Sequence, residues 1–328
     1  MKNKLKIVSM AKYLPQKIES SEIEEKYGIP KGWSEKYSGV KSKHWVTHET
    51  NAFMGAECLK SALKKARLKL KDLDLIISAS GTYDYPIPHQ APLIKKQLNN
   101  FGTDVPAISI DSTCLSFVTA LDIASYLLDG RRYKRIAIVS SEISSKNLNP
   151  KDYETFTLFG DGASCAIVEY CPNEDSEILS AYMITKEEGA EETIVKGGGI
   201  KYHQKDNPFT PEMYSFQMKG INLLRLAKKF IRPFIDVLIN KSNISINDID
   251  YFIPHQGSKM GLFLFEKIYP EFKNKVGNNL STQGNCIAAS IPMALYDAIE
   301  LGKIKRGDIV VLAGTSAGFS IGGLILKY

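Results

Sequence analysis

Three residues stand where the chain passes from one structural element to the next, and each has a side chain suited to covalent or hydrogen-bonding chemistry. Cys114 follows the apolar stretch "ISID" and precedes "LSFVTALDIASYLL", in which apolar residues recur with helical spacing. A thiol at the start of a helix lies beside unpaired N–H groups and the positive end of the helix dipole, which lower its pKa below about 8.5. We therefore predict that Cys114 is a nucleophile and not a small buried side chain.

The other two residues are His255 and Asn285. His255 directly follows the apolar strand in "DIDYFIPHQ", so we expect its ring to point into a crevice and to form a hydrogen bond there. His89 and His203 also precede glutamine, but they lie in a proline-rich loop and a Gly/Lys-rich loop. Asn285 is expected at the N-cap of the helix in "NCIAASIPMALYDAI", and capping alone would explain it. Its neighbour Cys286 is interpreted as structural.

Two glycine-rich stretches accompany these residues, "LFGDGASCAIVEY" at 158–170 and "AGTSAGFSIGGLILKY" at 313–328. Neither has the glycine spacing or the lysine of a nucleotide-binding loop. These glycines are better explained by a close approach of the backbone to the site. The N–H of Gly318 is expected to pair with that of Cys114 as an oxyanion hole.

The chain contains an internal repeat. "LKLKDLDLIISAS" (68–80) resembles "ISINDIDYFIPHQ" (244–256), and the helices that begin near Cys114 and Cys286 are each followed by an apolar strand. Alternation of helices with buried strands predicts an α/β fold of two similar halves, residues 1–172 and 173–328. The repeat nearly superimposes Asn285 on Cys114, so both helix starts are expected to face one crevice between the halves.

Composition narrows the class of protein. The chain has 328 residues, 44% of them hydrophobic, and a formal net charge of +6 that is scattered among acidic residues, which argues against nucleic-acid binding. Five cysteines without CxxC spacing or a nearby histidine pair argue against disulfides and a zinc site. No stretch has the length and apolarity of a membrane span or signal peptide, so we expect a cytoplasmic protein.

Five motifs in order carry a resemblance to a known family: "DSTCLSFVTALDIA", "FGDGAS", "DIDYFIPHQGSK", "GNCIAASIPMALYDAI" and "GTSAGFSIGG". Together they resemble the β-ketoacyl-acyl carrier protein synthase III family of the thiolase superfamily. The resemblance implies a homodimer of subunits with a layered α/β/α/β/α core. It also implies that Cys114 accepts an acyl group, and that His255 and Asn285 stabilise the enolate formed by decarboxylation of a malonyl thioester.

The implied reaction is a decarboxylating Claisen condensation that yields a β-ketoacyl thioester in fatty-acid or specialised lipid and polyketide biosynthesis. It needs no metal or redox cofactor, because neutral hydrogen-bond donors in a dry pocket stabilise the developing charge. Acyl-CoA and the phosphopantetheine of an acyl carrier protein would be the substrates, and the carrier protein would be the partner.

Departures from the family pattern suggest a specialised member. Trp33 matches the tryptophan beside the coenzyme A adenine, but Tyr37 and Tyr153 stand where two arginines are expected, which argues against efficient use of acetyl-CoA. Ile87 corresponds to the aromatic residue that closes the acyl pocket across the dimer interface, so a longer acyl chain is expected. Lys259, in "HQGSK", is the candidate contact for an acidic carrier protein, with a solvated charge as the alternative.

Three other functions stay open at this point. The first is a non-decarboxylating acyltransferase on the same fold, and the second is a catalytically silent partner subunit. The third is a hydrolase with a cysteine, a histidine and an asparagine, which the chain order and the repeat fit poorly.

Overall fold

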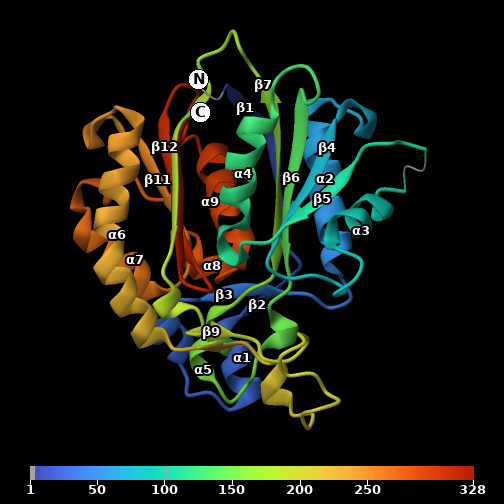
Figure 1. Cartoon of the computed structure of the whole chain (residues 1–328). Coiled ribbons are helices and arrows are strands. Elements are labelled where there is room, and N and C mark those ends of the chain that lie inside the picture. Colours follow the sequence, from blue (N-terminus) through green and yellow to red (C-terminus); the bar gives the residue numbers. More distant parts are fainter. Residues whose placement is uncertain (1–3, 100–101) are drawn as a thin grey trace.

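Two large β-sheets enclose a pair of helices at the centre of the molecule (Figure 1). The structure is a computed structural model and describes residues 4–99 and 102–328. The N-terminal sheet has the strand order β1-β7-β6-β4-β5 and the C-terminal sheet the order β11-β12-β13-β8. Both are mixed: β4 is parallel to β5 and β6, and β11 is parallel to β12, whereas β1–β7, β6–β7, β12–β13 and β13–β8 are antiparallel.

The strands of the two sheets have the following bounds. The N-terminal sheet consists of β1 (Leu5–Tyr13), β4 (Leu75–Ala79), β5 (Ala107–Ile110), β6 (Arg135–Glu142) and β7 (Gly162–Tyr170). The C-terminal sheet consists of β8 (Glu177–Thr185), β11 (Tyr251–Pro254), β12 (Ile309–Ser316) and β13 (Ser320–Lys327). The boundary predicted at residue 172 falls in the loop between β7 and β8, and the division into two domains stays a prediction.

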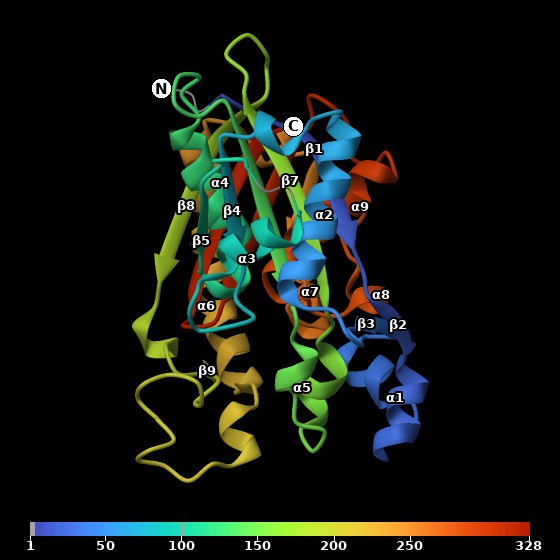
Figure 2. The ribbon, with the colours of Figure 1, turned by 90° about the vertical axis from the view of Figure 1, so that its right-hand side faces the viewer.

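Helices form the other three layers. Between the sheets lie α4 (Ser116–Leu127) and α9 (Ser290–Glu300). The outer face of the N-terminal sheet is covered by α2 (Asn51–Ala66) and α3 (Gln90–Gln97), as Figure 2 shows, and that of the C-terminal sheet by α6 (Gly220–Ser242) and α7 (Lys259–Ile268). The predicted α/β/α/β/α order is therefore confirmed.

Short elements extend the molecule below the sheets in Figure 1. They are β2 (Gln16–Glu19), α1 (Ser20–Tyr27), β3 (Ser42–Trp45), α5 (Tyr153–Leu158), β9 (Thr193–Ile194), β10 (Gln217–Met218) and α8 (Leu280–Gln283). In the part of the chain that the structure describes, no helix is both long enough and apolar enough to cross a bilayer.

One buried cluster joins the two halves at the centre. Leu121 of α4 and Leu295 of α9 are fully buried in it together with Ile138 of the N-terminal sheet and Leu312 of the C-terminal sheet. Strands buried on both faces favour apolar side chains at successive positions, which explains the runs 75–77 in β4 and 136–139 in β6. The central helices are thereby held rigidly, and so are the loops that lead into them.

Candidate active site

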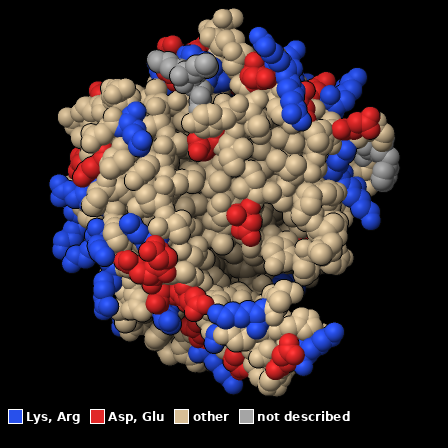
Figure 3. All heavy atoms as spheres, viewed as in Figure 1, with Lys and Arg blue, Asp and Glu red and all other residues tan. Residues whose placement is uncertain are grey.

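A cavity of about 1350 Å³ reaches from the lower extension into the space between the sheets. The face drawn in Figure 3 is hollowed between the two sheets and this extension. Cys114, His255 and Asn285 all line the cavity, although they come from three separate segments of the chain. The structure therefore brings together the three residues that the sequence singled out.

Cys114 lies in a single 3₁₀ turn, Thr113–Leu115, between β5 and α4. Helix α4 begins at Ser116, two residues after the predicted start at Cys114. The turn is tight: Thr113 has a φ of +49°, and the N–H of Ser112 donates to the hydroxyl of Ser116 at 2.9 Å. This turn leaves the thiol half-buried at the wall of the cavity.

The same turn recurs before α9, which corrects the predicted superposition of Asn285 on Cys114. The N–H of Cys286 donates to Ser290 at 2.9 Å, and Ile287 has a φ of +48°. The hydrogen bond matches that of Ser112 with Ser116, and the φ of Ile287 matches that of Thr113. Asn285 is consequently the counterpart of Asp111, three residues before Cys114. It is also not the N-cap of α9, because that position is Ala289.

The predicted low pKa of Cys114 is wrong. Burial raises the pKa of its thiol to about 12, and the carboxyl of Glu142 at the end of β6 adds to the rise. Hydrogen bonds from the backbone at Ala317 and at Cys114 itself oppose it. The sequence pattern shows the junction of strand and helix, but not the acid that the fold brings next to it.

Glu142, which acts on the pKa of Cys114 without lining the cavity, is the charged neighbour of the site that sequence reasoning missed. It is fully buried and accepts hydrogen bonds from the N–H groups of Gly81 and Thr82 at 2.7 and 2.9 Å and from the Thr82 hydroxyl at 2.5 Å. Burial nevertheless raises its pKa to about 8. Its only signal in the sequence is an acid at the end of the apolar run "RIAIVSSE".

His255 directly follows β11 and is held by its backbone, since its N–H donates to the carbonyl of Ala313 at 2.8 Å. Gly314 leaves room for it, because a Cβ there would lie 2.4 Å from the Cβ of His255. Burial lowers the pKa of the imidazole to about 4, and Nδ1 is buried with no hydrogen-bond partner among the described residues. The ring is therefore neutral at physiological pH.

Asn285 is held in place by side-chain and backbone contacts. Its Oδ1 accepts from the N–H of Ile287 at 2.9 Å, and its Nδ2 donates to the carbonyl of Gly257 at 3.2 Å. This leaves one N–H of the amide for a ligand. The backbone of Asn285 pairs with Leu158 and Gly160, and a Cβ at Gly160 would lie 2.2 Å from the carbonyl oxygen of Gln283. The glycine in "LFGDGAS" thus permits the close backbone approach that the sequence suggested.

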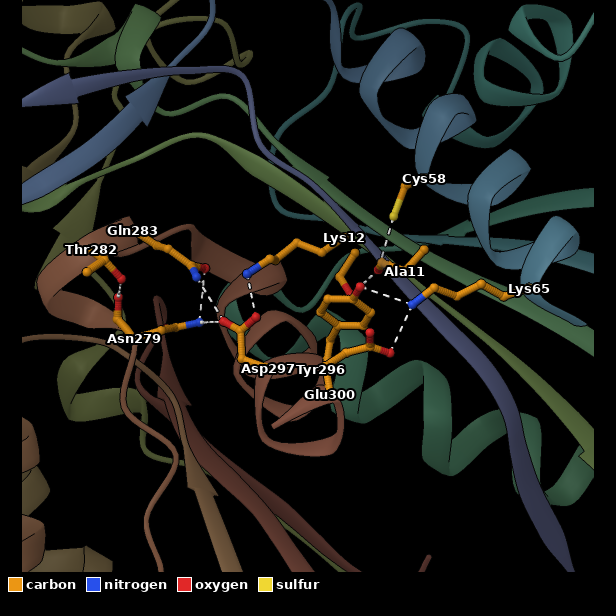
Figure 4. Close-up of polar contacts among 11 residues, drawn as sticks. Ala11, Lys12, Cys58, Lys65, Asn279, Thr282, Gln283, Tyr296, Asp297 and Glu300 are labelled. Atoms are coloured by element: carbon orange, nitrogen blue, oxygen red, sulfur yellow. Dashed lines mark hydrogen bonds and ion pairs between the residues drawn. The ribbon is translucent and has the colours of Figure 1, made fainter. Parts of the chain in front are cut away.

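A polar network anchors the segment before Asn285 (Figure 4). Asp297 of α9 accepts from Nδ2 of Asn279 at 3.1 Å and from Nε2 of Gln283 at 2.8 Å, and it also pairs with Lys12 of β1. The network ties α8 to the central helix α9 and to the N-terminal sheet. It thereby fixes the start of the loop that carries Asn285.

The residues expected at the substrate entrance form an aromatic cluster in the lower extension. The ring of Trp33 lies 4.1 Å from that of Tyr37 and 5.6 Å from that of Tyr153 between centroids. Trp33 and Tyr37 line the cavity, whereas Tyr153 does not and contacts Trp33 edge to face. The cluster presents ring faces but no guanidinium group, as the departures from the family pattern imply.

The remaining predicted residues differ in their relation to the cavity. Gly318 lines it with a φ of +77°. Ile87 does not line it and is 87% exposed. The ammonium of Lys259 donates to the carbonyls of Glu35 and Lys36 at 3.3 and 2.9 Å, so it braces the turn that carries Tyr37.

Comparison with known proteins agrees with this arrangement. The family profile for 3-oxoacyl-[acyl-carrier-protein] synthase III matches residues 108–187, and the profile for the C-terminal part of the same enzymes matches 239–328. The β-ketoacyl-[acyl-carrier-protein] synthase III of Aquifex aeolicus is 30% identical over 98% of this chain and 99% of its own. That of Clostridioides difficile is 29% identical over 100% of this chain and 99% of its own.

A solved structure extends the likeness to three dimensions. The crystal structure of 3-oxoacyl-[acyl-carrier-protein] synthase III from Aquifex aeolicus superimposes with a TM-score of 0.88 at 29% identity, covering 99% of this chain and 100% of the other. The likeness includes both sheets and the central helices that position the cavity. The chain belongs to the β-ketoacyl-[acyl-carrier-protein] synthase III family of acyl-transferring enzymes.

Proposed function

We propose that the protein condenses an acyl group bound to Cys114 with a malonyl thioester, releasing carbon dioxide and forming a β-ketoacyl thioester. The observation that carries this proposal is that Cys114, the neutral His255 and Asn285 line the same cavity. A neutral imidazole and an amide donate hydrogen bonds to an enolate oxygen without bringing a competing charge. Membership of a family of condensing enzymes supports the same reaction.

The first half-reaction transfers the primer. The sulfur of Cys114 attacks the carbonyl carbon of an acyl thioester, and the carrier thiol leaves with the proton that the Cys114 thiol loses. Because burial raises the pKa of Cys114 to about 12, this proton leaves as the new bond forms and not beforehand. The N–H groups of Cys114 and of the 317–318 segment stabilise the oxyanion, with Gly318 as the proposed partner.

The second half-reaction extends the chain. The malonyl thioester loses carbon dioxide, and the resulting enolate is stabilised by hydrogen bonds from His255 and from the free N–H of Asn285. The enolate carbon attacks the acyl group, the carbon–sulfur bond to Cys114 breaks, and the sulfur takes up a proton from water. No step requires a change in oxidation state, so the residues of the chain suffice.

The aromatic cluster is the proposed entrance for the carrier of the acyl group. Trp33 and Tyr37 offer ring faces for the adenine of coenzyme A. Helix α6 carries exposed cations that offer a surface for an acidic acyl carrier protein: Arg225, Lys228, Lys229, which also pairs with Glu188, and Arg232. Lys259 contributes to this entrance indirectly, by bracing the turn beneath Tyr37.

We further propose a homodimer. Ile87 is 87% exposed in a loop in which Tyr83 and Tyr85 are also more than half exposed, while Pro86 of the same loop lines the cavity. A second copy of the chain would cover these apolar side chains. Light scattering tests this arrangement, and a monomer at micromolar concentration would contradict it.

The decisive experiment measures carbon dioxide release and product formation from malonyl-carrier protein with a panel of acyl-CoA primers. We expect both in the unsubstituted protein and no primer-dependent product in Cys114→Ala. Cys171→Ala, which removes a thiol outside this cavity, is the matched control. Acyl transfer from Cys114 to another acceptor without carbon dioxide release would support the non-decarboxylating alternative instead.

A further inference from the structure

The two turns that carry Cys114 and Asn285 each contain a residue with a strained backbone. Thr113, directly before Cys114, has a φ of +49°. Ile287, two residues after Asn285, has a φ of +48°. The left-handed region is unfavourable for β-branched side chains, and such residues stay in it only where their surroundings enforce it. A neighbour that contacts both turns is therefore able to control the geometry of the site.

Gly81, which closely follows β4 and lines the cavity, contacts both turns. A Cβ at this position would lie 3.1 Å from the Cα of Thr113 and 3.2 Å from Cγ2 of Ile287. Glycine thus allows this segment to lie between the two turns, with little room for a side chain. Because a close-packed interior transmits small displacements, a shift of Gly81 shifts both turns.

The carboxylate of Glu142 holds Gly81 in place. Its Oε1 accepts the N–H of Gly81 at 2.7 Å, and its Oε2 accepts the N–H and the hydroxyl of Thr82 at 2.9 and 2.5 Å. Glu142 is fully buried at the end of β6, and β6 pairs with β4. Hydrogen bonds to an ionised acceptor are about twice as strong as those between neutral groups. The segment 81–82 is thereby fixed to the end of the central strand.

The hydroxyl of Thr82 shows that this cluster is built around an acceptor. It accepts from Nδ2 of Asn51 at 3.2 Å and from the N–H of Ile143 at 3.1 Å, so its single proton is directed to Glu142. Every group that hydrogen-bonds to the carboxyl is therefore a donor. A proton on the carboxyl would be a further donor among these, and it would release the segment that the carboxylate holds.

We propose that Glu142 is a positioning residue that sets the placement of Cys114 relative to Asn285 by holding Gly81 between their turns. Glu142 does not line the cavity, so it acts through this contact and not on the substrate. The inference rests on the proposed function, in which Cys114 and Asn285 serve the same condensation.

The charge of Glu142 and its hydrogen bonds affect the site in opposite directions. The charge raises the pKa of the Cys114 thiol and so slows reactions of the free thiol. The hydrogen bonds fix the position of the thiol, which speeds its reaction with a bound and oriented substrate. Removal of the carboxyl therefore speeds reaction with a small reagent and slows catalysis. A neighbour that acted through its charge alone would speed both.

The test compares Glu142→Gln with the unsubstituted protein at pH 9, where the Glu142 carboxyl is largely ionised because its pKa is about 8. Glutamine keeps the size of glutamate but turns an NH₂ group toward N–H donors. We expect kcat for condensation to fall about 10- to 100-fold with KM nearly unchanged, while alkylation of Cys114 by iodoacetamide becomes faster. Glu169→Gln, on the adjacent strand β7 and outside the cavity, is the matched control and should change neither rate.

Thr82 provides a second test that leaves the buried carboxyl in place. Thr82→Val keeps the size of the side chain but removes the hydroxyl that donates to Glu142, and it should lower kcat about tenfold. Thr82→Ser retains the hydroxyl and should keep kcat near the unsubstituted value. A role in packing alone would predict the reverse, because serine loses the methyl group that valine retains.

Faster condensation or an unchanged kcat in Glu142→Gln would overturn the inference. If that variant does not fold, as circular dichroism would show, a kcat as high in Thr82→Val as in Thr82→Ser would overturn it instead. Carbon dioxide release by the unsubstituted protein is measured separately. Its absence would refute the condensation, whereas slower acylation of Cys114 in Glu142→Gln, followed by intact mass, would still support the positioning role.

Discussion

The reactivity of Cys114 offers the sharpest test of the site, because the structure and the sequence pattern predict opposite behaviour. With a thiol pKa of about 12, only about one molecule in 10⁴ carries a thiolate at pH 8. A free cysteine with a pKa of about 8.5 would be about one-quarter ionised at that pH. The free protein should thus react with iodoacetamide about 10³-fold more slowly than a cysteine peptide.

The assay follows alkylation of the Cys114 peptide by mass spectrometry between pH 7 and 10. We expect the rate to rise about tenfold per pH unit without a plateau, because the thiolate is the reacting form. Glu142→Gln removes the neighbouring carboxyl that raises the pKa of the thiol. Because the pKa of Glu142 is itself about 8, the substitution should speed alkylation above that pH, by up to about tenfold, and have little effect below it. A plateau below pH 9 in the unsubstituted protein would refute burial as the dominant influence.

Three further predictions address other parts of the site and fold. Asn285→Ala should lower decarboxylation of malonyl-carrier protein by about 10²–10³ while acylation of Cys114, followed by intact mass, persists. Trp33→Ala should raise the KM for acyl-CoA about tenfold, measured by steady-state kinetics, and leave that for acyl-pantetheine unchanged. Burial lowers the pKa of Lys43 to about 7, so between pH 7 and 9 the unfolded chain holds a proton that the folded chain lacks. Urea denaturation should therefore show stability rising by up to about 1.4 kcal/mol per pH unit from this group, and Lys43→Met should remove that slope.

Each of these predictions has a result that contradicts it. Loss of acylation in Asn285→Ala would indicate a damaged fold and not a missing enolate contact. A rise in KM for acyl-pantetheine as large as that for acyl-CoA would exclude Trp33 as an adenine contact. An unaltered pH slope in Lys43→Met would show that the buried amine does not govern stability in this range.

The sequence by itself determined the α/β fold of two similar halves and singled out Cys114, His255 and Asn285, which the structure brings to one cavity. Short apolar runs specify strands covered on both faces, as at 75–77 in β4, and helical spacing specifies α4 and α9. Cys114 and His255 were visible because each ends or follows such a run. These features are local, and a local pattern can be read without knowing what packs against it.

Only the tertiary structure decided the electrostatic state of the site. Glu142 lies far from Cys114 in sequence, but its carboxyl is close enough to raise the pKa of the thiol. The link is Gly81, whose N–H donates to Glu142 and whose Cα packs against Thr113. Asn285 corresponds to Asp111 in the repeat because each accepts the N–H of the residue two positions later in its own turn. Burial and proximity arise from contacts between distant segments, so neither can be read from spacing along the chain.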